Sequence, residues 1–115
     1  MTENSLAVSV LEKLPVIVFL LNNYMLGMVA QWQRTFYNRR YMGVQQNRCP
    51  DYVKLAESYG AQGMRVQSIN ELDKAIKVGL SSDVATVIDI PIDPEEDVYP
   101  FVAPGSGLKD MIVGG

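Results

Sequence analysis

FLLNNYMLGMVAQWQRTFYNRRY, residues 19–41, is the stretch that decides how the fold is interpreted. Its first residues complete a continuous run of apolar and β-branched side chains, Val16 to Leu21. Such a run is typical of a strand buried on both faces of a parallel sheet. Two amides, Asn22 and Asn23, follow at the carboxyl end of this predicted strand. The sequence therefore places polar side chains where a buried strand stops.

A helix is predicted after the asparagines, from about Gly27 to Asn38. Met28, Trp32 and Phe36 recur in it at helical spacing and form one apolar stripe. This periodicity alone favours Trp32 as a core residue rather than as the wall of a binding pocket.

The remainder of the chain alternates between helix and strand patterns. The first helix has the stripe Leu6, Val10, Leu11 and Leu14, with Thr2 or Asn4 as a cap. In chain order we expect a helix over Glu3–Leu14 ended by Pro15, and a later helix with Pro50 at its first position that ends at Gly60. A strand over Gln62–Gln67 follows, and then a helix opened by the capping box of Ser68 and Glu71. A buried strand over Val84–Ile90 comes next, before a Pro/Gly-rich tail with a helical turn near Leu108–Ile112.

This alternation predicts an α/β fold with a doubly wound parallel sheet and helices on both faces. Three strands make only part of such a sheet, so we expect a partial domain over residues 1–92 and a C-terminal tail over residues 93–115. Ligands of doubly wound sheets bind outside the carboxyl ends of the strands. Asn22 and Asn23 are predicted to lie at that edge.

Composition narrows the function classes. The chain has 115 residues, 48% of them hydrophobic, which suits one small globular domain. The net charge of −3 argues against a nucleic-acid partner, because phosphate contacts need a clustered positive surface. Arg34, Arg39 and Arg40 are interpreted as a solvated helix end, and the acidic run Asp93–Asp97 as a solvated loop rather than a metal site.

The absence of histidine excludes Ser-His and Cys-His couples and imidazole metal ligands. The single cysteine, Cys49, cannot form an intrachain disulfide, so cytoplasm is the default location. The apolar run Leu14–Leu21 is too short to span a bilayer, and the first residues lack a signal-peptide pattern. We therefore expect a soluble intracellular protein without a membrane partner.

Paired asparagines have two interpretations. An asparagine oxygen is a ligand for Mg²⁺ or Ca²⁺, and its amide nitrogen can donate to a phosphate oxygen. Asparagine is also common in turns for backbone reasons. The Asn-Asn dipeptide alone favours this turn interpretation over a ligand site.

Three segments carry a resemblance to a known family: LPVIVFLLNNYMLGMVAQWQRTFYNRRY, PDYVKLAESYGAQGMRV and DPEEDVYPFVAPGSGL. Together they resemble the C-terminal part of the thiamine-diphosphate-binding domain of the acetolactate synthase catalytic large subunit, also called acetohydroxyacid synthase. In thiamine-diphosphate enzymes the cofactor motif opens with Gly-Asp-Gly and closes with paired asparagines. Only the close is in this sequence, so the resemblance implies a domain truncated at its N-terminus.

The resemblance implies roles for residues near the asparagines. Asn23 would be the side-chain ligand of Mg²⁺ and the backbone carbonyl of Met25 a second ligand, while Asn22 would brace the turn. Gly27 and Met28 would lie against thiamine diphosphate. Met28 and Trp32 would border the substrate pocket, which reverses the preference for Trp32 as core. The family's aspartate ligand is missing, so metal affinity without it should be poor.

The implied reaction decarboxylates pyruvate and joins the product to a second 2-oxo acid, in branched-chain amino-acid biosynthesis. In the family the activating glutamate belongs to a neighbouring subunit, so none of the glutamates here is assigned a catalytic role. FAD would be bound outside this chain. The partners would be the remainder of the catalytic subunit or a homologous chain in a homo-oligomer, in the cytoplasm, or in an organelle of a plant or fungus. The alternatives are another thiamine-diphosphate-dependent 2-oxo acid decarboxylase or carboligase, and a non-catalytic interaction module derived from the same fold.

Overall fold

The computed structural model describes residues 4–46 and 50–114. Cys49, Thr2 and the predicted helix start at Glu3 lie outside these residues. The elements in chain order are α1 (Ser5–Leu11), β1 (Ile17–Asn22), α2 (Gly27–Phe36), α3 (Tyr52–Ser58), β2 (Gln62–Arg65), α4 (Ile69–Leu80), β3 (Thr86–Pro91) and a 3₁₀ turn, η1 (Leu108–Asp110). Among the described residues, the helices are too short or too polar to cross a membrane.

The three strands form one parallel sheet in the order β1-β3-β2. Ile17 to Asn22 pair with Thr86 to Pro91, and Gln62 to Arg65 pair with Thr86 to Asp89. The central strand β3 is buried from Thr86 to Asp89, as its apolar sequence predicts. The predicted parallel α/β architecture is confirmed.

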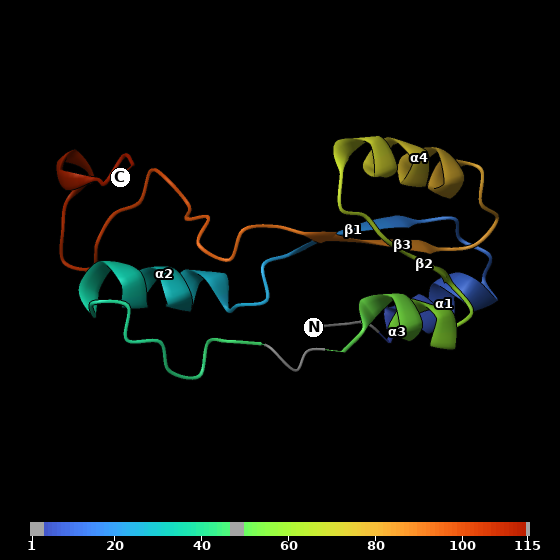
Figure 1. The fold of residues 1–115 in the computed structure, drawn as a ribbon, viewed down its shortest axis with the longest axis horizontal. Coiled ribbons are helices and arrows are strands. Elements are labelled where there is room, and N and C mark those ends of the chain that lie inside the picture. The colour runs from blue at the N-terminus through green and yellow to red at the C-terminus, as the bar shows by residue number, and fades with distance from the viewer. Residues whose placement is uncertain (1–3, 47–49, 115) are drawn as a thin grey trace. The chain divides into compact units, whose positions relative to one another are not determined.

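Helices cover both faces of this sheet (Figure 1). On one face, α1 and α3 pack through Leu6, Val10 and Ala56 on a cluster with Ala85 and Val87. On the other, α4 packs on a second cluster, whose members are Val66, Ala75 and Ile88 with Ile17, Met64, Leu72, Ile76 and Ile90 around them. The fold is therefore doubly wound, and its core lies along β3.

One glycine fixes the distance between α3 and β2. A Cβ added at Gly63 would lie 2.5 Å from the carbonyl oxygen of Val53 and 2.8 Å from its Cα. Both of these atoms belong to the backbone, so a larger residue cannot be accommodated by turning a side chain. Gly63 therefore allows α3 to lie directly against the sheet.

Caps determine where two helices begin. Ser68 Oγ accepts a hydrogen bond from the N–H of Glu71, as predicted. The Glu71 carboxylate accepts from the N–H of Gln67, the residue before the cap, rather than from Ser68 as in a standard capping box. For α3 the prediction of Pro50 at the first helical position is wrong. Asp51 caps this helix by accepting from the N–H groups of Val53 and Lys54, so the helix begins at Tyr52.

Two other expectations are corrected. Strand β1 is not buried on both faces: it lies at the sheet edge, and Val18, Phe19 and Leu21 are exposed, Leu21 by 64%. Helix α1 ends at Leu11 rather than Leu14, since Lys13 takes a positive φ, and Leu11 and Leu14 point to solvent. Within the described chain, the Asn4 side chain makes no capping bond to α1.

The chain divides into two compact units, which we describe separately. The sheet unit comprises Met1–Tyr24 and Arg48–Ile92, and the α2–tail unit comprises Met25–Asn47 and Asp93–Gly115. Each unit therefore joins segments that are distant in sequence.

Two glutamines tie the α2–tail unit together. Gln31 is buried, and its amide donates to the carbonyl of Val98 at 2.9 Å while its oxygen accepts from the N–H of Val98 at 3.1 Å. Gln33 makes the same two-way pairing with the backbone of Met42, at 3.1 and 3.0 Å. Each side chain thus holds a backbone segment against α2 as a neighbouring strand would.

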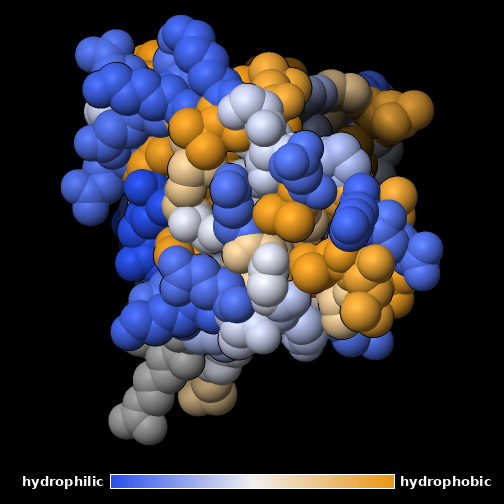
Figure 2. Space-filling view, turned by 90° about the vertical axis from the view of Figure 1, so that its right-hand side faces the viewer, coloured by the Kyte–Doolittle hydropathy of each residue, from blue (hydrophilic) through white to orange (hydrophobic). Residues whose placement is uncertain are grey.

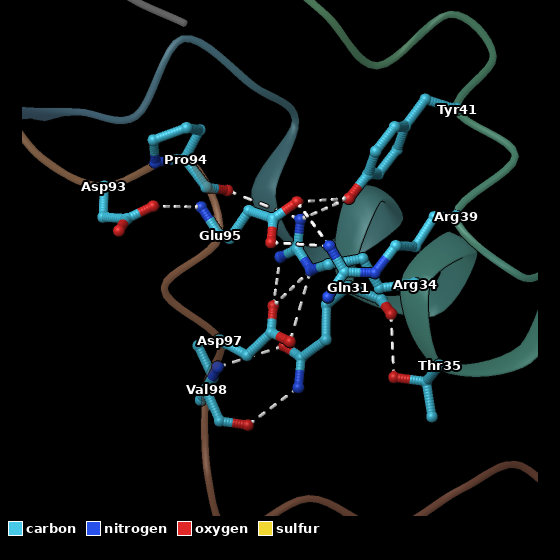
Figure 3. A network of polar contacts seen from close by, with 10 residues as sticks. All are labelled: Gln31, Arg34, Thr35, Arg39, Tyr41, Asp93, Pro94, Glu95, Asp97 and Val98. Atoms are coloured by element: carbon cyan, nitrogen blue, oxygen red, sulfur yellow. Dashed lines mark hydrogen bonds and ion pairs between the residues drawn. The ribbon is translucent and has the colours of Figure 1, made fainter. Parts of the chain in front are cut away.

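Two of the arginines predicted to be solvated, Arg34 and Arg39, bind residues of the acidic run (Figure 3). Arg34, whose side chain is only 6% exposed, forms an ion pair with Asp97 and also donates to Tyr41 and to the carbonyl of Pro94. Arg39 pairs with Glu95 at 2.8 Å, and this pair is exposed. The solvated interpretation is therefore wrong for Arg34 and Asp97, because each neutralises the other where water is largely excluded.

Candidate functional site

A row of polar side chains crosses the sheet near the carboxyl ends of its strands. It comprises Asn22 on β1, Asp89 on β3 and Arg65 on β2. Arg65 and Asp89 are direct register partners, whereas Asn22 pairs with Pro91, two residues further along β3. Side chains two residues apart on a strand share a face, so all three meet on one side of the sheet.

Asn22 has both ends of its amide occupied inside the protein. Its Nδ2 donates to Asp89 Oδ1 at 3.1 Å, and its Oδ1 accepts from the N–H of Tyr24 at 3.1 Å. Tyr24 has a φ of +54°, a left-handed conformation that a bulky residue adopts only when its surroundings hold it there. The expectation that Asn22 braces the turn is therefore confirmed.

Asp89 is fully buried, and Arg65 balances its charge. Arg65 Nε donates to Asp89 Oδ2 at 2.9 Å, and its Nη2 lies 3.6 Å from Asp51 Oδ1, at the cap of α3. The hydrogen bond to Asp89 raises the pKa of Arg65 above its ordinary value. Arg65 thus carries its positive charge directly beside the buried carboxylate.

The other predicted site residues fall on both sides of the division between the units. Asn23 is half-buried and belongs to the sheet unit, directly after Asn22. Met25 belongs to the α2–tail unit, where it forms an isolated antiparallel bridge with Gln45. The structure thus places Asn22 and Asn23 in one braced turn, and Met25 at the start of the segment that enters α2.

Gly27, Met28 and Trp32 lie on α2. Gly27 is its first residue, and Met28 is exposed by 53%. Trp32 is exposed by 40% and meets Phe36 edge to face, with 6.3 Å between the ring centroids. The interpretation of Trp32 as core from periodicity alone is wrong, because Ala30 and Gln31 are the buried residues of this helix. A pocket-wall role for Met28 and Trp32 remains a prediction.

The predicted metal ligands fit a cation site in part. The Asn23 side chain and the Met25 carbonyl are oxygen donors of the kind that Mg²⁺ accepts, but both are neutral. Among residues 4–46 and 50–114, three or more His, Cys, Asp or Glu side chains do not gather at any point suited to a metal. The two predicted ligands therefore supply oxygen donors without a negative charge.

Asp89 and Gln31 are buried polar residues that the sequence pattern did not single out as functional. Asp89 is the only charged residue within the apolar run Val84–Ile90, and a carboxylate there needs a partner, which was a usable signal. Gln31 gave no such signal, because its partner Val98 lies 67 residues away.

Comparison with known proteins shows the family. Residues 1–90 match the model described as "Thiamine pyrophosphate enzyme, C-terminal TPP binding domain". Because this match covers most of the chain, the protein belongs to the family of C-terminal thiamine-diphosphate-binding domains of thiamine pyrophosphate enzymes.

The chain is similar in sequence to acetolactate synthases. The chain is 40% identical over 112 residues to the mitochondrial acetolactate synthase catalytic subunit of Saccharomyces cerevisiae, covering 97% of this chain and 16% of the relative. It is 39% identical over 122 residues to chloroplastic acetolactate synthase 1 of Zea mays, covering 100% of this chain and 19% of the relative. The resemblance found in the sequence is confirmed, and the chain spans less than a fifth of the length of these relatives.

A solved structure agrees with the fold. The thiamine diphosphate-dependent 4-hydroxybenzoylformate decarboxylase of Rhodococcus jostii RHA1 superposes with a TM-score of 0.74 at 26% identity, covering 83% of this chain and 18% of that one.

Proposed function

We propose that the chain forms part of the catalytic subunit of an acetolactate synthase, which decarboxylates pyruvate and joins the remaining two-carbon unit to a second 2-oxo acid. The observation that carries this proposal is the identity of 39 to 40% to acetolactate synthases of yeast and maize over essentially the whole chain. The likeness to the 4-hydroxybenzoylformate decarboxylase is lower, at 26%.

The role of this chain would be to anchor the cofactor. Thiamine diphosphate supplies the carbon nucleophile when bound. Asn23 would hold Mg²⁺ through its side-chain oxygen and Met25 through its backbone carbonyl, with a carboxylate from outside the chain completing the site. Gly27 would let the backbone approach the cofactor closely, and Met28 would pack against it. Met28 and Trp32 would form part of the substrate pocket, for which their exposure leaves them accessible.

Catalysis would need residues that this chain does not provide. We assign no catalytic residue here and expect the isolated chain to form no acetolactate. The activating glutamate would come from a neighbouring subunit, and FAD would be bound elsewhere in the parent enzyme.

Association would cover the apolar surface of the sheet unit. Val18, Phe19 and Leu21 are exposed on the edge strand β1, and exposed apolar side chains on an unpaired strand edge favour association. Hydrophobic surface is also scattered among hydrophilic residues on the face shown in Figure 2. The remainder of the catalytic subunit, or a homologous chain in a homo-oligomer, would cover it. The location would be the cytoplasm, or an organelle in a plant or fungus.

The metal role of Asn23 is tested by Asn23→Gly in the complete protein. Glycine tolerates a turn conformation as well as asparagine does but offers no side-chain oxygen. We expect the Mg²⁺ and thiamine diphosphate concentrations for half-maximal acetolactate formation to rise at least tenfold. Asn23→Asp is the matched control, because it keeps an oxygen ligand and should retain part of the affinity.

Two results would contradict these assignments. Equal cofactor requirements for Asn23→Gly and the parent would show that Asn23 is only a turn residue. An aldehyde rather than acetolactate as the product from pyruvate would identify a decarboxylase instead.

A further inference from the structure

We propose that Asp89 is a positioning residue that sets the orientation of the Asn22 amide, and through it the turn that presents Asn23. The inference rests on the proposed function only in taking Asn23 as a cation ligand. Its structural part depends on contacts within the sheet unit alone.

A carboxylate in the middle of a buried strand needs a reason. Asp89 lies on the central strand β3 between Ile88 and Ile90, and its side chain is fully buried. An apolar residue at this position would extend the core without any cost of removing a charge from water. Arg65 offsets that cost on one side, which leaves the second carboxylate oxygen to act on Asn22.

The chemistry of that contact selects one orientation of Asn22. An asparagine side chain can be turned over, which exchanges its oxygen and nitrogen. The Asp89 carboxylate, paired with Arg65 through Oδ2, presents Oδ1 as an acceptor, so it favours Asn22 Nδ2 facing it, at the observed 3.1 Å. Asn22 Oδ1 is then aimed at the N–H of Tyr24, where it accepts at 3.1 Å.

The orientation of Asn22 in turn holds the backbone around Asn23. The bond from Tyr24 closes a turn of three residues with Asn23 in the middle, and Tyr24 is held at a φ of +54°. Release of this bond would remove a restraint on a strained backbone. Asn23 would then sample several directions, and a cation that needs its oxygen at one place would bind more weakly.

The central test is a double-variant cycle in the complete protein. Asp89→Asn has one acceptor for two donors, so it cannot face both Arg65 and Asn22 Nδ2. Asn22→Asp alone puts two carboxylates together. The exchange Asn22→Asp with Asp89→Asn restores every pairing: position 22 still accepts from Tyr24 and now accepts from position 89, whose oxygen accepts from Arg65.

We expect each single variant to raise the Mg²⁺ and thiamine diphosphate concentrations for half-saturation at least tenfold, by titration calorimetry. The exchange variant should return within threefold of the parent. Ile88→Val is the matched control, because it loosens the core beside Asp89 without touching Asn22, and it should bind as the parent does. Hydrogen exchange supplies a readout independent of the cofactor: the Tyr24 amide should exchange at least tenfold faster in Asp89→Asn and regain protection in the exchange variant.

The outcomes separate this inference from the proposed function. Absence of acetolactate in the parent, with cofactor binding that responds to the variants as expected, overturns the proposed reaction and supports Asp89 as a positioning residue. Parent-like binding and Tyr24 protection in Asp89→Asn overturn the inference and leave the reaction standing. If Asp89→Asn does not fold, the exchange variant decides: binding weakened tenfold in a folded exchange variant overturns the inference, and binding within threefold supports it.

Discussion

Different forces stabilise the inside of the sheet unit and the inside of the α2–tail unit. In the sheet unit, apolar side chains of α1, α3 and α4 cover β3 on both faces. In the α2–tail unit, the connections between helix and tail include the backbone pairing of Gln31 with Val98, the ion pair of Arg34 with Asp97, and the ring contact of Phe36 with Phe101. One small chain thus combines burial-driven packing in one unit with directional polar contacts in the other.

This difference has an energetic consequence. Apolar packing degrades gradually, because a lost methyl group removes only part of a contact surface. Removal of one partner of a buried polar pair has a large free-energy cost, because the other partner stays buried without a hydrogen bond or an opposite charge. Loss of one partner of the Arg34–Asp97 pair in the α2–tail unit should therefore cost more than loss of one apolar contact in the sheet unit.

The largest effect is expected from Asp97→Ala. The contact with Asp97 raises the pKa of Arg34, and the guanidinium stays charged after Asp97 is removed. A nearly buried cation without its partner should cost about 3 to 5 kcal/mol. The local free energy of opening, measured by hydrogen exchange at Phe101 in the tail, should fall by that amount.

The same experiment contains its control. The exchange of Ile88 in the sheet unit should stay unchanged in Asp97→Ala, and Glu96→Ala, at an exposed neighbour, should alter neither unit. An equal loss of protection in both units would show that the polar contacts do not act locally.

Gly63→Ala should break the sheet unit instead. The new methyl group would meet the Val53 backbone at 2.5 Å, so α3 and β2 have to separate. We expect a loss of about 3 kcal/mol, at the upper end of the usual cost of overpacking. Protection of the β2 amides reports it.

Gly107→Ala is the matched substitution in the α2–tail unit, where the added Cβ meets its nearest neighbour at an ordinary 3.5 Å. A change within about 0.5 kcal/mol is expected there. A similar loss in both variants would mean that the change from glycine, rather than the Val53 contact, is responsible.

The same contrast explains what the sequence could predict. The sheet unit was predictable because its signals are local in sequence: the apolar runs of β1 and β3 and the capping box of α4 identify the strands, the helix and their order along the chain. The burial of β1 was not predictable, because the same apolar run occurs in a central strand and in an edge strand. Edge position depends on the order β1-β3-β2, which pairs strands far apart in sequence.

Prediction of the candidate site was similarly uneven. The position of Asn22 and Asn23 followed from the strand before them, whereas the resemblance alone suggested that Asn22 braces the turn. Asn22 bonds to Asp89, which is 67 residues away on another strand. Gln31 bonds to Val98, which is also 67 residues away, in the tail. Arg34 was misread for the same reason: arginine at a helix end is usually solvated, and only the folded tail brings Asp97 to it.

The smallest effect is expected from Arg39→Gln, which tests the weaker of two ion pairs within the α2–tail unit. Arg39 and Arg34 both bind a carboxylate of the same acidic run. In the Arg39–Glu95 pair, however, the Arg39 side chain is 63% exposed and the Glu95 side chain 45% exposed. Water solvates both charges there, so the pair should contribute only about 0.5 kcal/mol.

A double-variant cycle of Arg39→Gln and Glu95→Gln measures that contribution, again through the exchange of the tail amides. The coupling should shrink further in 0.5 M salt, because mobile ions screen exposed charges, whereas the loss caused by Asp97→Ala should change little. A coupling for Arg39 as large as the loss for Asp97 would contradict the argument, since it would mean that burial does not determine how strongly these arginines hold the tail.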